Sequence, residues 1–339
     1  MTRASRARRL ATAAAYGGGG LGLVGAGLAT LLRQEARLAR RRVESRTAKA
    51  DPPTGEGRYG HHRGKQIVLA VLGDSSAVGL GVDRAERTPG VLVASALAEV
   101  AERPVRLVKV AVSGARSADL AGQVERVLPH RPDVAMIMIG ANDVTSRSKP
   151  ALAVRDLAAA VRSLRETGCE VVVGTCPDLG TIRPVQQPLR TLGRRWSRQL
   201  AAAQTMAVVA EGGRTVSLGS LLGPQFASDR TMFSSDEFHP SAAGYAAAAA
   251  CLLPSVADAL GVWPASADRG ARGLRRDTVR PIARAAASAA GRPGTEVQPA
   301  SVDGSDAGPR GPWALLRRRR PQELPEATPA TETSGATDR

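Results

Sequence analysis

The sequence predicts an α/β fold, a three-layer α/β/α sandwich with a mostly parallel sheet. Five apolar runs, each of strand length, alternate with helical stretches between residues 66 and 260. The first three runs end in small polar residues, which is typical of buried strands that meet a loop. Strands that alternate with helices predict parallel pairing, with helices on both faces of the sheet.

Each run has a definite place in the chain. The expected strands are residues 66–72, 105–112, 133–140, 170–175 and 214–218. The expected helices are residues 90–102, 117–128, 151–167, 189–211 and 240–260. The chain of 339 residues is long enough for one large domain or two small ones, and we assign the folded core to residues 65–263.

The positive charge is concentrated at the two ends of the chain. The whole sequence carries a net charge of +16, of which residues 1–63 hold +9 and residues 264–339 hold +4. The middle segment, 64–263, holds only +3. A folded segment with so small a net charge is poorly suited to neutralising phosphates, so we expect no nucleic-acid partner.

The N-terminal segment, residues 1–49, has the features of a membrane anchor. Residues 10–32 contain no charged side chain, and 23 residues at about 1.5 Å each span a hydrocarbon core of about 30 Å. Arginines flank the run on both sides, so the charge pattern does not fix its orientation. We expect one uncleaved transmembrane helix at the cell membrane or cell envelope. The alternatives are a cleaved signal peptide, which would make the protein secreted, and a soluble Gly-rich helix.

Two further segments lack the pattern of a folded domain. Residues 50–64 are rich in Pro, Gly and polar residues, which predicts a linker. Residues 264–339 are dominated by Pro, Ala, Ser, Gly and scattered charges, which predicts a disordered basic tail.

Nucleophilic chemistry is indicated at the ends of the expected strands, where active groups collect in open α/β sheets. Ser75 follows the first strand, and a serine is a weak nucleophile unless a base takes its proton. Of the four histidines, His239 is the one in a structured polar context, SSDEFHP. Asp236 precedes it by three residues, close enough to orient its imidazole.

These residues resemble the SGNH hydrolase superfamily, also called the GDSL esterases and lipases, whose four blocks occur here in order. Gly-Asp-Ser at 73–75 matches the nucleophile block, and Asp236-x-x-His239-Pro240 matches the block of the acid and the base. Gly114 matches the oxyanion-hole glycine, and Asn142 in Gly-Ala-Asn-Asp matches the oxyanion-hole asparagine. The first block departs from the family in reading G-D-S-S, which leaves the serine and its preceding acid intact.

The resemblance covers residues 66–260 and implies a flavodoxin-like sheet and a carboxylic ester hydrolase. It implies Ser75 as nucleophile, His239 as base and Asp236 as orienting acid. The backbone N–H groups of Ser75 and Gly114 and the Asn142 amide would form the oxyanion hole. No cofactor or metal is expected, and the substrate is a small or lipid-like acyl ester. The alternative is a non-catalytic carbohydrate- or lipid-binding module on the same fold.

Several other side chains leave two interpretations open. We expect Asp74 to accept hydrogen bonds from loop amides and Asp143 to brace its loop. The three phenylalanines, Phe226, Phe233 and Phe238, either line an acyl pocket or anchor their loop by packing. The four arginines after the fourth expected strand either face an anionic substrate or form a solvated helix face; they are Arg183, Arg190, Arg194 and Arg195.

Overall fold

The computed structural model describes residues 54–146 and 148–263, together with Thr30, Gln34, Glu35, Leu38 and Arg41. Backbone contacts divide the chain into Met1–Gly304 and Ser305–Arg339, and every described residue belongs to the first unit. The expected anchor at 10–32 lies outside the described residues apart from Thr30. The expected tail at 264–339 lies outside them entirely.

The described residues contain one mixed, six-stranded sheet. Its strands are β1 (Gly57–Tyr59), β2 (Ile67–Gly73), β3 (Val105–Lys109), β4 (Val134–Met138), β5 (Glu170–Gly174) and β6 (Arg214–Val216). The order across the sheet is β1-β3-β2-β4-β5-β6, with β1 antiparallel to β3 and all other pairs parallel. The five parallel strands follow the flavodoxin order, whose switch point lies between β2 and β4. Ligands bind outside the carboxyl ends of the strands at such a point.

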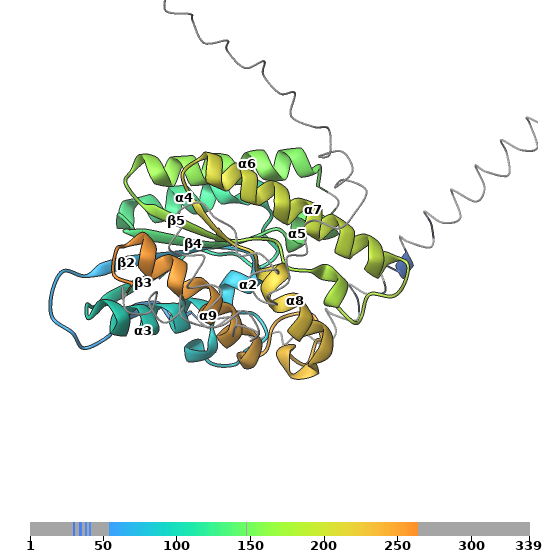
Figure 1. The fold of residues 1–339 in the computed structure, drawn as a ribbon, viewed down its shortest axis with the longest axis horizontal. Helices are drawn as coiled ribbons and strands as arrows, with labels where there is room; N and C mark the ends of the chain where they lie inside the picture. Colours follow the sequence, from blue (N-terminus) through green and yellow to red (C-terminus); the bar gives the residue numbers. More distant parts are fainter. Residues whose placement is uncertain are drawn as a thin grey trace, which may run out of the picture. The chain divides into compact units, whose positions relative to one another are not determined.

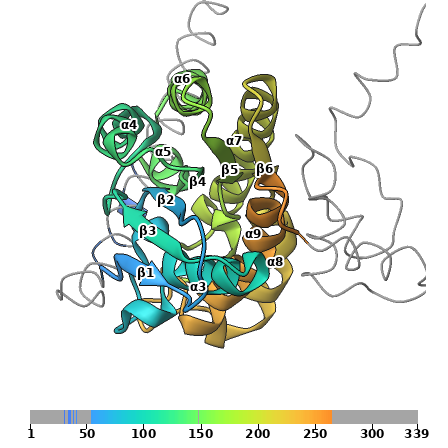
Figure 2. The same cartoon turned by 90° about the vertical axis from the view of Figure 1, so that its left-hand side faces the viewer.

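Helices cover both faces of this sheet (Figures 1 and 2). The helices on one face are α4 (Leu120–Val127), α6 (Pro150–Glu166) and α7 (Leu189–Ala210). Those on the other face are α3 (Pro89–Ala101), α8 (Leu218–Ser228) and α9 (Ala242–Ala259), while short α2 (Ser75–Val78) and α5 (Ala141–Thr145) follow β2 and β4. Pro89 and Pro150 begin their helices, where the missing N–H costs nothing.

Alternation along the strands divides the core into two layers. Leu69 and Val71 of β2 pack on the side of α3 and α9, whereas Ala70 and Leu72 pack on the side of α4 and α6. Both sets are fully buried, so the strand appears in the sequence as a continuous apolar run rather than an alternating one.

Besides the short helices α2 and α5, which are not among the expected helices, two elements differ from the sequence prediction. Strand β1 lies inside residues 50–64, the expected linker, and pairs with the edge strand β3. Helix α8 was not predicted, because its sequence LGSLLGPQFAS contains two glycines and a proline, which lower helix propensity. Its apolar face compensates, since Leu218, Leu221 and Leu222 are buried in the core.

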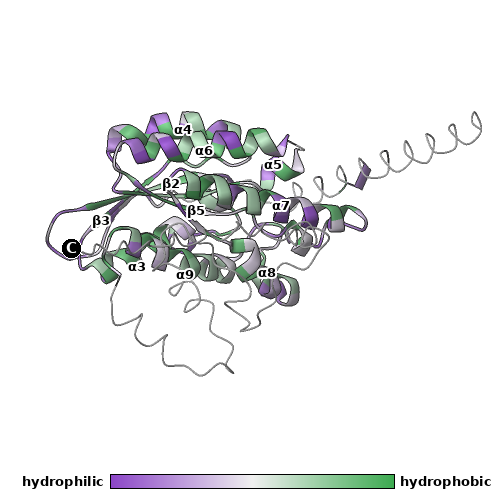
Figure 3. Ribbon diagram, turned by 45° about the horizontal axis from the view of Figure 1, so that its top comes forward, coloured by the Kyte–Doolittle hydropathy of each residue, from purple (hydrophilic) through white to green (hydrophobic). Residues whose placement is uncertain are grey.

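Among the helices that the structure describes, α9 has the length and the apolar composition that crossing a membrane would require. More than half of it is buried, and it packs against α3, β5 and β6. It is apolar along most of its length, whereas α4 and α6 also carry polar residues (Figure 3). We therefore interpret α9 as a core helix of the sandwich.

Candidate active site

The backbone at the end of β2 fixes the position of Ser75. Gly73 has a φ of +131°, and a Cβ atom there would lie 1.9 Å from the carbonyl oxygen of Met138 on β4. The N–H of Asp74 donates to that same carbonyl over 3.0 Å. Because only glycine permits this close approach, the chain turns sharply and begins α2 at Ser75.

Asp74 is the N-cap of α2, and its Oδ1 accepts a hydrogen bond of 2.9 Å from the backbone N–H of Ser76. This confirms the prediction that it accepts from a loop amide. Burial raises the pKa of Asp74 to about 6, although the Ser76 N–H and the nearby charge of His239 oppose the rise.

His239 is held at the end of a tight loop before α9. The N–H of Ser234 donates to the carbonyl of His239 over 2.9 Å, and Phe233 pairs with Pro240 as an isolated β-bridge. Glu237, inside the loop, has a φ of +56°. The loop therefore closes on itself and directs the imidazole toward β2.

Three side chains form a continuous chain of hydrogen bonds that ends at the Ser75 hydroxyl. The Nε2 atom of His239 lies 3.1 Å from Oγ of Ser75, and its Nδ1 atom lies 2.6 Å from Oδ2 of Asp236. All three residues are buried, with at most 8% of each exposed. The structure thus brings the first residue of α2 together with two residues of a loop more than 150 positions further along the chain.

The carboxylate of Asp236 is held in its ionised form. Burial on its own would raise its pKa, but the hydrogen bond from His239 and the histidine's charge outweigh burial and hold the pKa well below its usual range. Its Oδ1 atom also accepts from the Ser234 hydroxyl and from the N–H groups of Phe238 and His239, over 2.8, 2.9 and 2.9 Å. An ionised carboxylate only accepts hydrogen bonds, so Nδ1 of His239 carries a proton; in the neutral imidazole, Nε2 is then the atom that can accept the hydrogen bond of the Ser75 hydroxyl.

A hydrogen bond joins Asn142, in the short helix α5, to the loop that contains Gly114. The Nδ2 atom of Asn142, in α5, donates to the carbonyl of Ala115 over 3.0 Å. Gly114, the neighbour of Ala115, is exposed and has a φ of +81°. An amide carries two N–H donors, and this bond occupies one of them.

Asp143 was expected to brace its own loop, but it lies in α5 and instead connects α5 to the segment that follows β3. Its buried carboxylate accepts from the Ser117 hydroxyl over 2.8 Å and from the Ser117 N–H over 3.0 and 3.2 Å. Desolvation by burial raises its pKa against the effect of these bonds.

Gln123 is a supporting residue that the sequence analysis missed. From α4, its amide Oε1 accepts from the N–H of Gly73 over 2.7 Å, and its Nε2 donates to the Gly73 carbonyl over 2.9 Å. These two buried hydrogen bonds to the backbone of Gly73 fix the turn that precedes Ser75. A polar residue on the buried face of an amphipathic helix is the signal that would have indicated it.

An apolar pocket of about 90 Å³ adjoins Ser75 and His239. All three phenylalanines, Phe226, Phe233 and Phe238, are among its lining residues. They also pack edge-to-face, with Phe226 on Phe233 at 4.9 Å and Phe238 on the imidazole of His239 at 4.8 Å between ring centroids. The phenylalanines therefore both line a pocket and pack against neighbouring rings, and the acyl role of the pocket stays a prediction.

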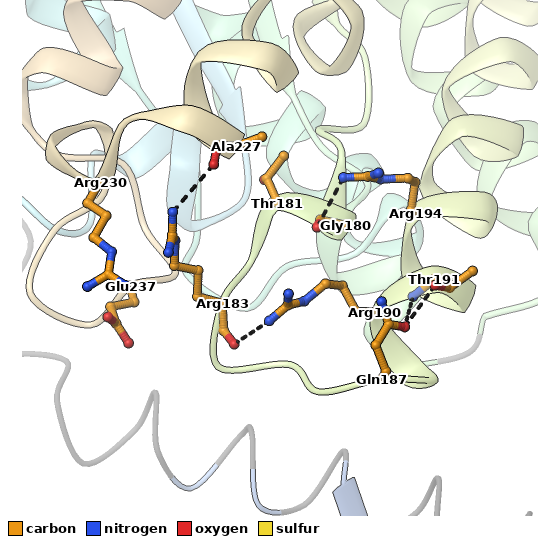
Figure 4. Close-up of a pocket in the computed structure, with 10 residues that line it drawn as sticks. All are labelled: Gly180, Thr181, Arg183, Gln187, Arg190, Thr191, Arg194, Ala227, Arg230 and Glu237. Carbon is orange, nitrogen blue, oxygen red and sulfur yellow. Dashed lines mark hydrogen bonds between the residues drawn. The ribbon is translucent and has the colours of Figure 1, made fainter.

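A second pocket contains three of the four arginines selected from the sequence. Arg183, Arg190 and Arg194 line it together with Arg230, whereas Arg195 is exposed and not among the lining residues (Figure 4). Arg230 was not selected because it lies 36 positions beyond Arg194, after α8.

Within the described ranges, no group of three or more His, Cys, Asp or Glu side chains is arranged to hold a metal ion. The three cysteines are free and buried. Burial raises the pKa of Cys169 and of Cys251 to about 12, so these thiols are poor nucleophiles at neutral pH.

A histidine between a serine and an ionised aspartate, at the carboxyl ends of a parallel sheet, is the arrangement typical of serine hydrolases. The chain belongs to the GDSL-like lipase/acylhydrolase family, whose sequence model matches residues 71–247, just over half of the chain. It is therefore a carboxylic ester hydrolase, and the resemblance drawn from the four motifs is confirmed. This sets aside the alternative of a non-catalytic binding module.

Individual relatives are similar to this chain over the same region. The GDSL-like esterase Rv1075c of Mycobacterium tuberculosis is 45% identical over 222 residues, which cover 62% of this chain and 71% of that protein. The crystal structure of TesA is 24% identical with a TM-score of 0.44, covering 57% of this chain and 97% of TesA. An acetylxylan esterase from Geobacillus stearothermophilus is 18% identical with a TM-score of 0.44, covering 60% and 98% respectively.

Proposed function

We propose that this chain hydrolyses short-chain acyl esters through a Ser75-His239-Asp236 triad and an acyl-enzyme intermediate. The observation that carries the proposal is the buried hydrogen-bonded chain from Asp236 through His239 to the Ser75 hydroxyl. His239 Nε2 takes the hydroxyl proton while Oγ attacks the ester carbonyl, and the imidazolium is stabilised by Asp236. His239 then gives the proton to the leaving alcohol, and water repeats the sequence to release the acid.

The oxyanion formed by this attack needs donors that are already in place. Ser75 is the first residue of α2, and the first N–H groups of a helix have no carbonyl partner within it. The N–H of Gly114 and the second N–H of the Asn142 amide complete the proposed oxyanion hole. The support for these two is their motif match and the bond that joins α5 to the loop of Gly114.

The size of the apolar pocket limits the acyl group. A cavity of about 150 Å³ lined by apolar side chains holds a benzene molecule, which has six carbon atoms. The pocket beside Ser75 offers about 90 Å³, so on this scale it accepts roughly three or four carbon atoms. Acetyl to butyryl groups fit, whereas a fatty acyl chain would have to lie outside it.

The test is a chain-length series of 4-nitrophenyl esters, from acetate to decanoate, with the purified full chain. We expect kcat/KM to be highest at two to four carbons and to fall sharply beyond. Ser75→Ala and His239→Ala should abolish turnover, while Ser76→Ala, the matched control on the neighbouring serine, retains most of it. Full activity in Ser75→Ala would disprove the assignment of the nucleophile, and a maximum at eight or ten carbons would disprove the proposed acyl size.

We also propose that residues 10–32 tether the hydrolase domain to a membrane. The support is the uncharged length of this segment and the arginines on both sides of it. Full-length protein should sediment with membranes and keep its N-terminal peptide in mass spectrometry, and a chain lacking residues 1–49 should be soluble. Loss of the peptide, with release of the protein, would instead identify a cleaved signal.

A further inference from the structure

The arginine pocket, defined by Arg183, Arg190, Arg194 and Arg230, has a volume of about 520 Å³ and lies next to the candidate active site. Its four arginines come from three separate segments: the loop that follows β5, the first turns of α7, and the short turn after α8 (Figure 4). Convergence from separate segments distinguishes the pocket from a solvated face of a single helix.

The guanidinium groups are held mainly by backbone carbonyls. Arg190 donates to the carbonyls of Val185 and Arg183, each over 2.9 Å. Arg183 donates to the carbonyl of Ala227 over 3.4 Å, and Arg194 donates to that of Gly180 over 3.3 Å. Such bonds orient the side chains without neutralising their charge. A guanidinium has five N–H donors, so each of these arginines retains donors beyond the bonds it makes to described residues.

The charge of the pocket is strongly positive. Its ten lining residues include four arginines and one carboxylate, Glu237. Asp178, outside the lining, lies 3.5 Å from Arg194, but it also pairs with Arg198 at 3.0 Å. The lining therefore has a net charge of +3, in fork-shaped donors that match the oxygens of a phosphate.

The arginine pocket is close to the reacting atoms. Thr181 lines both this pocket and the apolar pocket beside Ser75. Glu237 lines the arginine pocket, and it lies between Asp236 and Phe238 in the loop that carries His239. The two pockets therefore share Thr181 as a lining residue, and the loop that carries His239 also contributes a residue to the arginine pocket.

We propose that the arginine pocket binds a phosphate group on the alcohol portion of the ester, an inference that rests on the esterase function proposed above. The acyl group occupies the apolar pocket, so the alcohol must extend elsewhere. A charged pocket is unsuited to an acyl chain and suited to a dianion. The substrate class is therefore a short-chain acyl ester of a phosphorylated alcohol.

The experiment compares two esters that differ only in the phosphate: 1-acetylglycerol and 1-acetylglycerol 3-phosphate. We expect the full chain to hydrolyse the phosphorylated ester with a kcat/KM at least tenfold higher, mainly through KM. The double variant Arg183→Gln/Arg230→Gln should bring the ratio of the two kcat/KM values close to one. The ratio cancels any general loss of activity in the variant. The control is Arg195→Gln, because Arg195 is exposed and lies in α7 beside Arg194 but does not line the pocket. This variant should keep the wild-type ratio.

Three results would overturn the proposal. A wild-type ratio near one would show that phosphate is not recognised, and an unchanged ratio in the double variant would place recognition elsewhere. A higher kcat/KM for 3-O-acetylglycerate than for 1-acetylglycerol 3-phosphate would show that the pocket recognises a carboxylate instead of a phosphate. A binding measurement separates this proposal from the esterase function. Ser75→Ala protein should bind glycerol 3-phosphate in a calorimetric titration, and Ser75→Ala protein that also carries the two arginine changes should not.

Discussion

Replacing Asp236 by asparagine tests the role of its charge without disturbing the loop. Oδ1 of Asp236 accepts three hydrogen bonds from Ser234, Phe238 and His239, and an asparagine oxygen can accept the same three. The change is then confined to the other atom, which lies 2.6 Å from Nδ1 of His239. An asparagine N–H placed there would donate to Nδ1 and move the imidazole proton to Nε2. His239 would then present a donor to Ser75, and it could no longer accept the hydroxyl proton.

The expected loss in kcat is about 10⁴-fold, which is the scale seen when the wrong imidazole tautomer is imposed in a serine triad. At 1.36 kcal/mol per factor of ten, this corresponds to about 5 kcal/mol of transition-state stabilisation. The assay is the initial rate with 4-nitrophenyl acetate at saturating concentration, together with urea unfolding to verify the fold. Asp229→Asn is the matched control, because Asp229 also accepts from a loop N–H and a hydroxyl, both of Thr231, but does not contact His239. A loss below tenfold in Asp236→Asn would refute the tautomer argument.

Three further predictions concern the residues around this chain of hydrogen bonds. Asn142→Ala should lower kcat by about 10²–10³-fold with little change in KM, because one oxyanion donor is lost, and an effect on KM alone would contradict that role. Gly73→Ala should destabilise the fold by about 3 kcal/mol or more in urea unfolding, since its Cβ would lie 1.9 Å from the Met138 carbonyl oxygen; a smaller loss would show that the turn relaxes. Burial raises the pKa of Asp74 from 3.8 to about 6, so the folded state binds the proton more tightly than the unfolded state. Stability relative to Asp74→Asn should therefore fall as pH rises from 4 to 6, by about 3 kcal/mol in total, and an unchanged difference between pH 5 and 7 would contradict the raised pKa.

The parallel sheet was predictable because its central strands are buried on both faces. Residues such as Leu69 and Ala70 face opposite helix layers, yet both are fully buried, so the whole strand is apolar in sequence. The edge strand β1 could not be predicted in this way. It has three residues, GRY, of which two are exposed, so the strand shows no apolar run in the sequence, and it pairs antiparallel with β3.

The candidate site was predictable where its residues occur in short local motifs. Asp236 and His239 lie three positions apart, and the tight loop between them brings them into contact. A polar residue on the buried face of a helix, such as Gln123, can be noticed in the sequence, but the distant partner of such a residue could not be predicted. Gln123 contacts Gly73 across 50 positions, and Arg230 joins Arg183 in one pocket across 47 positions. Such contacts depend on how the helices pack, which no local pattern records.

The central claim is that Ser75 is the nucleophile and His239 its base. The most direct measurement is labelling of the full chain with a fluorophosphonate ester, followed by peptide mass spectrometry. We predict a single covalent adduct on Ser75, formed rapidly in the wild type and at least 10²-fold more slowly in His239→Ala. An adduct on Ser76, or labelling at the same rate without His239, would contradict the claim.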